Sequence, residues 1–218
     1  MSSHLSARET ILGDVRRAVA AYALSPLEPL PAKAQFAPRK AGSPEEEMER
    51  MIREVRRLSG QAQRIGGRDE FAAAMAGLVR NEAVRTAAFS DHPLLEPYGV
   101  AEILKDLGVR LLPPGPDGRR LAECDLGMTV ADAAIPETGT VLLRTTKGQA
   151  DHLSILPRIH LALVSPAAFL PDLHQAFALA KGDRHFVLVS GSSRTADIEK
   201  VLTLGVHGPK SFHVWICG

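Results

Sequence analysis

The segment Ser190–Thr195, which follows an apolar stretch, contains the residue types best suited to hold an anion. Hydroxyl and guanidinium groups lie close together there, and all of them can donate hydrogen bonds to a phosphate or a carboxylate. The residues that carry these groups are Ser192, Ser193, Arg194 and Thr195. A helix predicted over 196–204 would add unpaired backbone N–H groups and the positive end of its dipole. We therefore predict an anion site at this turn.

The same turn also has a purely structural interpretation. Ser193 or Thr195 could cap the predicted helix, and Asp197 and Glu199 could stabilise it by interacting with its dipole. Those two acids would also repel a bound anion, so the sequence leaves both interpretations open. The expected position of the turn, outside the carboxyl end of a strand in an open α/β sheet, favours a ligand site.

A second candidate lies at Gly205–Pro209. Gly205 is expected to end the predicted helix in a left-handed conformation, and the Gly208-Pro209 pair favours a turn before the last strand. His207 stands between them and could donate a proton or bind a ligand. The alternative is a turn histidine that is hydrogen-bonded only to backbone.

A third candidate is the run Glu137-Thr138-Gly139-Thr140, which apolar segments flank on both sides. Glu137 is expected at the end of a strand, where a carboxylate could act as a base or a nucleophile. Gly139 permits a backbone conformation or a close approach that other residues cannot adopt. The alternative is a polar loop in which Glu137 only caps.

No motif for a redox cofactor or a metal occurs in the chain. The patterns GxGxxG, Walker A and CxxC are absent, which excludes the usual dinucleotide, phosphate-loop and iron–sulfur motifs. The histidines at 152, 160, 207 and 213 have no metal-ligand spacing. We therefore expect no cofactor and no metal on this chain.

Short aliphatic runs that alternate with helical patterns predict the elements that position these candidates. The predicted strands are 84–89, 109–112, 126–130, 140–143, 159–164, 186–189 and 212–216. The predicted helices are a run from Ser43 that ends at Gly66-Gly67, then 69–81, 100–107, 169–181 and 196–204. Continuous apolar strands are typical of a parallel sheet buried on both faces. The pattern predicts a three-layer, Rossmann-like α/β domain over 43–218.

Residues 1–42 differ from this pattern. A helix is predicted over 5–24, followed by a proline-rich stretch with Pro26, Pro29, Pro31 and Pro38. Such proline density favours an extended arm. The predicted N-terminal helical arm could dock on its own domain or on a partner.

Composition excludes several classes of protein. The 26 basic and 25 acidic residues leave a net charge of +1, and aromatic residues are 5%, so neither nucleic-acid binding nor membrane-surface binding is indicated. Two cysteines cannot form a disulfide scaffold. The N-terminus has no apolar core of a secretory signal and no run spans a bilayer, so we expect a cytoplasmic protein. Whether the chain forms homo-oligomers stays open.

Four segments in this order resemble the LUD-domain family: 131–140 with Glu137-Thr138-Gly139-Thr140, 154–160 with Ser154 and His160, 193–199, and 205–209. The resemblance covers about residues 45–218. It implies an α/β fold like that of ribose-phosphate isomerase and the CoA transferases. The positions that carry over as family-motif residues are Glu137, Thr138, Gly139, Ser193, Arg194, Thr195, Asp197, His207 and Gly208.

The resemblance also implies a function. It implies a subunit without a redox cofactor, in a system that oxidises L-lactate to pyruvate with partner proteins that carry iron–sulfur clusters. The alternative is a stand-alone enzyme or sensor of the isomerase/CoA-transferase fold. Such a protein would bind a phosphorylated or carboxylate molecule through Arg194, with Glu137 or His207 as the catalytic group.

Overall fold

The computed structural model describes residues 6–21, 39–113, 121–144, 150–183, 185–196, 202–205 and 207–218. The chain divides into two compact units, residues 1–37 and 38–218. In the first unit, helix α1 (Ala7–Ala21) leaves Ile11, Val15 and Val19 exposed. The division expected after residue 42 and the docking of the arm stay predictions. Asp197 lies outside the described residues.

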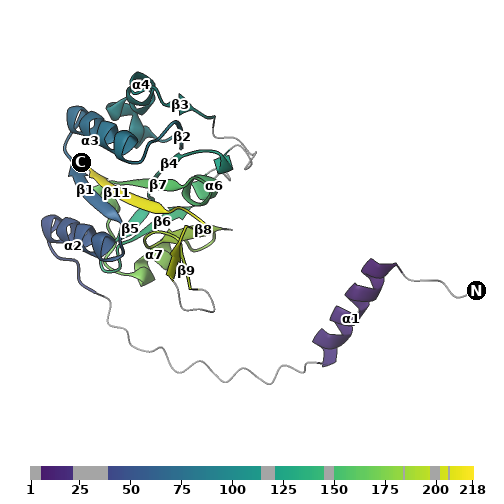
Figure 1. The fold of residues 1–218 in the computed structure, drawn as a ribbon. Helices are drawn as coiled ribbons and strands as arrows, with labels where there is room; N and C mark the ends of the chain where they lie inside the picture. Colours follow the sequence, from purple (N-terminus) through teal and green to yellow (C-terminus); the bar gives the residue numbers. More distant parts are fainter. Residues whose placement is uncertain are drawn as a thin grey trace, which may run out of the picture. The chain divides into compact units, whose positions relative to one another are not determined.

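A six-stranded, fully parallel sheet forms the centre of the second unit, in the order β1-β11-β7-β4-β2-β3 (Figure 1). The strands are β1 (Gln61–Ile65), β2 (Thr86–Phe89), β3 (Arg110–Leu111), β4 (Leu126–Val130), β7 (Ile159–Val164) and β11 (Ser211–Cys217). The residues of β7 and most of β11 are buried, as a strand covered on both faces requires. The predicted parallel α/β sheet is confirmed.

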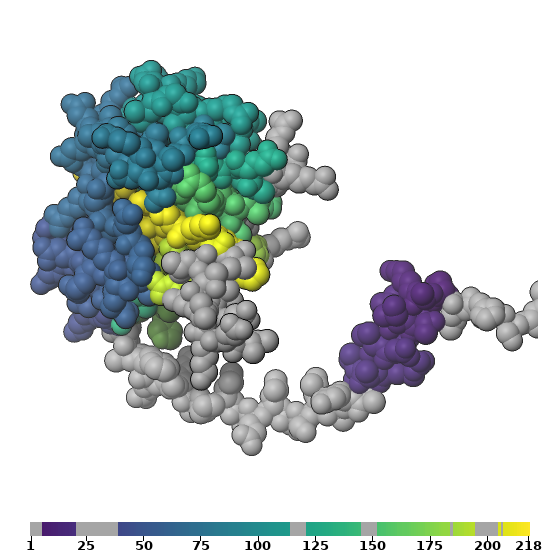
Figure 2. All heavy atoms as spheres, in the orientation of Figure 1, coloured from purple at the N-terminus to yellow at the C-terminus, as the bar shows by residue number. Residues whose placement is uncertain are grey.

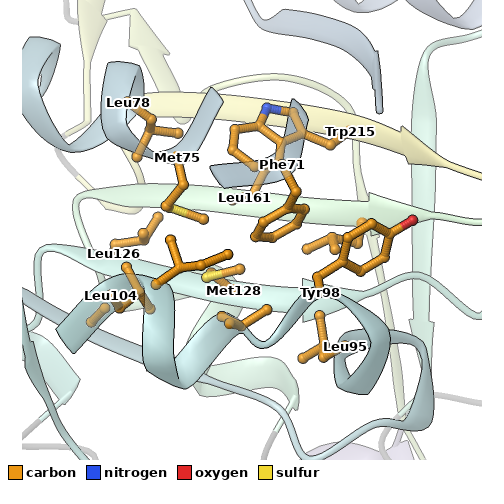
Figure 3. Packing of buried hydrophobic residues seen from close by; sticks show 14 of the residues in the cluster. Phe71, Met75, Leu78, Leu95, Tyr98, Leu104, Leu126, Met128, Leu161 and Trp215 are labelled. Atoms are coloured by element: carbon orange, nitrogen blue, oxygen red, sulfur yellow. The ribbon is translucent and has the colours of Figure 1, made fainter. Parts of the chain in front are cut away.

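Helices α3 (Arg68–Asn81) and α4 (Val100–Asp106), with the 3-10 helix η1 (Pro93–Tyr98), cover one face of this sheet. Figure 3 shows the resulting core, in which Phe71 packs between strand and helix side chains. Its ring lies 4.7 Å from that of Tyr98 in a stacked arrangement and 5.1 Å from that of Trp215 edge-on. This contact fixes α3 over β11.

Helix α2 (Pro44–Arg57) and a three-stranded antiparallel sheet cover the opposite face. The small sheet has the order β5-β6-β8, with β5 (Ala133–Ile135), β6 (Thr140–Arg144) and β8 (Phe186–Val189). Helix α7 (Leu173–Leu179) packs on it from outside, and α6 (Ala150–Ile155) lies against β4, β6 and β7 (Figure 1). A short 3-10 helix, η2 (Pro166–Ala168), follows β7.

The start of α2 is specified locally. The Ser43 hydroxyl accepts the N–H of Glu46, and the Glu46 carboxylate accepts the N–H of Ser43 at 2.7 Å. This reciprocal pair is a capping box, and Pro44 follows at the first helical position. The buried side chains Met51 and Val55 then attach the helix to the core.

Three predictions about the elements are wrong. Both described ends of the helix predicted over 196–204 are strands, because β9 (Arg194–Ala196) pairs antiparallel with β10 (Leu202–Leu204). The strand at 186–189 belongs to the antiparallel sheet; its run is continuously apolar because Val187 and Val189 pack toward α2 and its other two residues toward α7. The helix predicted from Ser43 to Gly66-Gly67 ends at Arg57, and the edge strand β1 follows, whose sequence Gln-Ala-Gln-Arg-Ile gave no apolar signal.

Both cysteines, Cys124 and Cys217, are free and buried. In the described part of the chain, no helix is long and apolar enough to cross a membrane. Helix α7 is also shorter than the predicted 169–181, because the Asp172 carboxylate caps it by accepting the N–H of Gln175 at 3.0 Å.

Candidate functional site

The turn Pro136–Gly139 brings the Glu137–Thr140 motif against the backbone of α2. Gly139 has a φ of +62°, a conformation that favours glycine. A Cβ at this position would lie 2.9 Å from the carbonyl carbon of Glu54 and from the nitrogen of Val55. Both reasons expected for a glycine, the unusual conformation and the close approach, therefore occur here.

A chain of hydroxyl groups connects this turn to the end of β8. Thr138 Oγ1 lies 2.7 Å from Thr140 Oγ1, and Thr140 Oγ1 lies 2.7 Å from Ser190 Oγ. Thr140 is buried, and its strand β6 runs beside β8 in the small sheet. The Glu137–Thr140 motif and the Ser190–Thr195 motif are therefore in direct contact.

The Ser190–Thr195 motif also contacts the C-terminal end of α2. Gly191 has a φ of +89°, and a Cβ there would lie 3.1 Å from both the Cβ and the oxygen of Leu58. Arg194 is exposed and donates from Nη2 to the Leu58 carbonyl oxygen. Because helix carbonyls at a C-terminus lack partners and carry partial negative charge, this guanidinium caps α2.

The Gly205–Pro209 motif packs on the Ser190–Thr195 motif. Ser193 donates its N–H to Pro209 O at 2.9 Å and accepts the N–H of Gly205 at 2.9 Å. A Cβ on Gly208 would lie 3.2 Å from the Cβ of Ser193. Gly205 adopts the expected left-handed conformation, with a φ of +73°, although it follows the strand β10 and not a helix.

The three motifs thus meet at one place, which we call the motif cluster: the turn 136–139 and Ser190–Arg194 against the last turn of α2, and Gly205–Pro209 packed on Ser193. Ser192 is buried within it, while Glu137 and His207 are exposed. Thr195 lies in β9, opposite Thr203.

The basis expected for the anion site has to be corrected. The helix whose N-terminus would have faced the anion is replaced by the β9–β10 pair, so that dipole is absent. The turn also lies beside the amino end of β11, because Ser193 bonds Pro209 just before that strand begins, and not at the carboxyl ends of the parallel sheet. The ligand-binding role of the motif residues stays a prediction that depends on their side chains.

Arg39 is a residue that the sequence did not single out. Its Nη1 and Nη2 donate to the two oxygens of Glu47 at 2.9 and 2.5 Å, and its Nε donates to Pro171 O at 2.6 Å. The pKa of Arg39 is raised chiefly by the bond to Glu47, with smaller effects from the charges of Glu137 and Asp172. A lone arginine after a proline-rich stretch gives no signal in the sequence that predicts this set of contacts, which we call the Arg39 hub.

Two histidines lie inside the sheet on opposite faces. His160 is fully buried, and its Nε2 lies 2.8 Å from Thr129 Oγ1. Burial, with a smaller effect from the charge of His213, lowers its pKa to about 3. His213, on the α3 face, also has a lowered pKa because of burial, which the charge of Glu82 opposes. Among the described residues, no three His, Cys, Asp or Glu side chains gather as a metal site.

All three motifs lie in the part of the chain that is similar to one family model. Residues 117–217 match the LUD domain model, and this range includes all three motifs. A protein named lactate utilization protein C from Halalkalibacterium halodurans is 29% identical over 153 residues, which are 65% of this chain and 66% of that protein. A protein of the same name from Exiguobacterium sp. is 38% identical over 100 residues, or 42% and 44% of the two chains.

These matches cover between 44% and 66% of the length of those two relatives. A crystal structure of a DUF162 family protein from Deinococcus radiodurans aligns with a TM-score of 0.62 at 21% identity. The alignment covers 82% of this chain and all of that one, which supports the same α/β fold.

Proposed function

From the match of residues 117–217 to the LUD domain model we propose that the protein takes part in the utilization of L-lactate. In this proposal it is a subunit or accessory protein of a system that oxidises L-lactate to pyruvate. The two electrons released pass to partner proteins that carry iron–sulfur clusters. The names of the curated relatives support the lactate role, and the family resemblance supports the partners.

The motif cluster is the proposed site of action. The observation that supports this is the contact among three separate motifs, two of which also lie against the last turn of α2. A guanidinium has five N–H donors, and the bond to the Leu58 carbonyl accounts for one of the two on Nη2. The remaining donors can pair with the carboxylate of a small hydroxy acid or keto acid. The three hydroxyls of Thr138, Thr140 and Ser190 share two hydrogen bonds, so one hydroxyl proton is left to donate.

Glu137 and His207, which are exposed members of this cluster, are the candidate proton-transfer groups. Neither Glu137 nor His207 carries electrons in the proposed reaction. The proposal assigns the anion-binding contribution to Arg194 and the conformation of the loops to Gly139 and Gly208.

Growth on L-lactate as the sole carbon source tests this proposal. A deletion strain is complemented with wild type, with Arg194→Lys and with Arg57→Ala. Lysine keeps a positive charge that can cap Leu58 but lacks the bidentate fork. Arg57 is an exposed arginine at the same end of α2, whose ion pair with Glu54 spans 2.7 Å, so it is the matched control.

We expect the deletion strain and the Arg194→Lys strain to fail on lactate and to grow normally on glucose, and the Arg57→Ala strain to grow on both. Normal growth of the deletion strain on lactate would contradict the lactate role. Full rescue by Arg194→Lys would contradict the assignment of the carboxylate to Arg194 while leaving the lactate role standing.

A further inference from the structure

A hollow of about 410 Å³ lies at the β1 edge of the parallel sheet. Its walls come from α3, from the edge strand β1 and from β11, and Arg56 in the last turn of α2 also lines it. Successive residues of a strand face opposite sides of a sheet, and His213 and Trp215 line this hollow while Phe212 and Val214 pack toward α2. We call it the α3–β1 hollow; its volume falls in the range of ligand pockets, about 300–1,000 Å³.

The hollow exists because α3 presents small residues to the strands at this point. Ala74 and Gly77 line it, and a Cβ on Gly77 would meet no heavy atom within 4 Å. The edge strand below offers Gln61 and Gln63, both exposed, in place of apolar side chains that would fill the space. In the space-filling view the yellow C-terminal segment comes to the surface beside the blue segments that contain β1 and α3 (Figure 2).

The floor of the hollow contains an ordered polar triplet. Ser211 Oγ donates to Glu82 Oε1 at 2.8 Å and lies 3.1 Å from His213 Nε2. A hydroxyl has one proton, so at the second contact it accepts and Nε2 is the donor. The neutral imidazole therefore carries its proton on Nε2, and Nδ1 is an acceptor.

The remaining polar groups are mostly amides. Gln61, Gln63 and Asn81 each present a donor and an acceptor in one plane. Arg56 and Glu82 carry opposite charges, so the lining as a whole has no net charge. Planar amides read the edges of heterocyclic bases because the bases offer donors and acceptors at the same spacing. The walls from Trp215, Ala74 and Gly77 suit a flat apolar face.

We propose that the α3–β1 hollow binds a neutral, flat heterocycle of the nucleobase class. The amides of Gln61, Gln63 and Asn81 recognise its edge, and the His213 acceptor and the Glu82 carboxylate bind its N–H groups. The phosphate of a nucleotide makes no contribution, since the charges in the lining are balanced. This site shares α2 with the motif cluster, through Arg56, and does not depend on the proposed lactate role.

Calorimetric titration of the full chain with adenosine, guanosine, cytidine and uridine tests the proposal, with adenosine monophosphate as a second probe. We expect saturable binding of at least one nucleoside. Gly77→Leu fills the hollow and should weaken that binding by about tenfold or more, while the matched control Gly77→Ala leaves most of the space and should bind as wild type does. Gln63→Ala, an exposed position that leaves the fold intact, should also weaken it.

Absence of binding for all four nucleosides at millimolar concentration would overturn the proposal. Equal affinity in wild type, Gly77→Leu and Gln63→Ala would place any binding elsewhere and would also overturn it. Binding of adenosine monophosphate without binding of adenosine would show phosphate recognition and contradict the neutral class of ligand. Equal binding of both adenine compounds supports it.

Discussion

Single glycines decide whether the motif cluster can form. The turn at Gly139 approaches the α2 backbone so closely that no side chain fits, and its φ is positive. Gly77 shows the opposite case, since it has an ordinary helical conformation and open space beside it. The same residue type is therefore required at one position and replaceable at the other.

This difference gives a matched pair of predictions at the residue scale. Gly139→Ala should lower the free energy of unfolding by about 2 kcal/mol or more, because it adds both backbone strain and a clash with the backbone at Glu54 and Val55. Gly77→Ala should raise it by about 0.5–1 kcal/mol, through helix propensity. Urea denaturation measures both. A neutral effect of Gly139→Ala would show that the turn can move away from α2.

At the scale of elements, α2 is the support on which the motif cluster is built. Its N-terminal end is fixed by the capping box at Ser43 and by the Arg39–Glu47 pair. Its C-terminal end receives Gly139, Gly191 and Arg194. A change at either end should therefore affect the stability of the whole helix.

The ion pairs of α2 predict unequal effects. Glu47 is 4% exposed, so Arg39→Ala leaves a buried carboxylate without its bidentate partner and should cost roughly 3 kcal/mol of stability. Arg64→Ala removes a pair with Glu45 in which both side chains are well exposed, and should cost about 1 kcal/mol or less. Urea denaturation of the two variants side by side measures the difference. Similar costs would contradict the buried role of Glu47.

At the scale of the whole molecule, the two layers that cover the sheet bury histidines on both of its faces. His160 lies under α2 and the small sheet, and His213 lies under α3. Both have lowered pKa values because burial disfavours the charged ring. The stability of the second unit is thereby coupled to pH.

The sign follows from the direction of the shift. The pKa of His160 is about 3 in the folded state, against roughly 6.5 for an unfolded histidine. The unfolded state therefore takes up a proton as pH falls below about 6.5 while the folded state does not, so stability is full above this pH and is lost toward pH 3. Urea denaturation should show a loss from this residue on the order of 1–2 kcal/mol between pH 7 and pH 5.

The variant His160→Gln keeps a hydrogen-bonding group near Thr129 but does not titrate, so its stability should depend less on pH over this range. His92→Gln, at an exposed position, is the matched control and should keep the wild-type profile. A wild-type profile in His160→Gln would show that other groups cause the acid sensitivity.

The sequence by itself determined the elements whose signals are local. The strands 126–130, 159–164 and 186–189 were predicted with the observed bounds, because each is a short apolar run between clear breaks. The start of α2 follows from Ser43 and Pro44, since capping depends only on neighbouring residues. The glycines at 139 and 205 were also identified as special backbone positions.

Tertiary structure decided what depends on pairing partners. Residues 202–204 could continue a helix or pair with Arg194–Ala196, and only the assembled fold selects the strand. Strand β1 forms with a polar sequence because β11 supplies its hydrogen bonds and α2 covers it. The sheet to which Phe186–Val189 belongs, and hence the position of the motif turn, depends on its pairing with β6. The motif cluster and the Arg39 hub unite residues far apart in the chain, which no local pattern encodes.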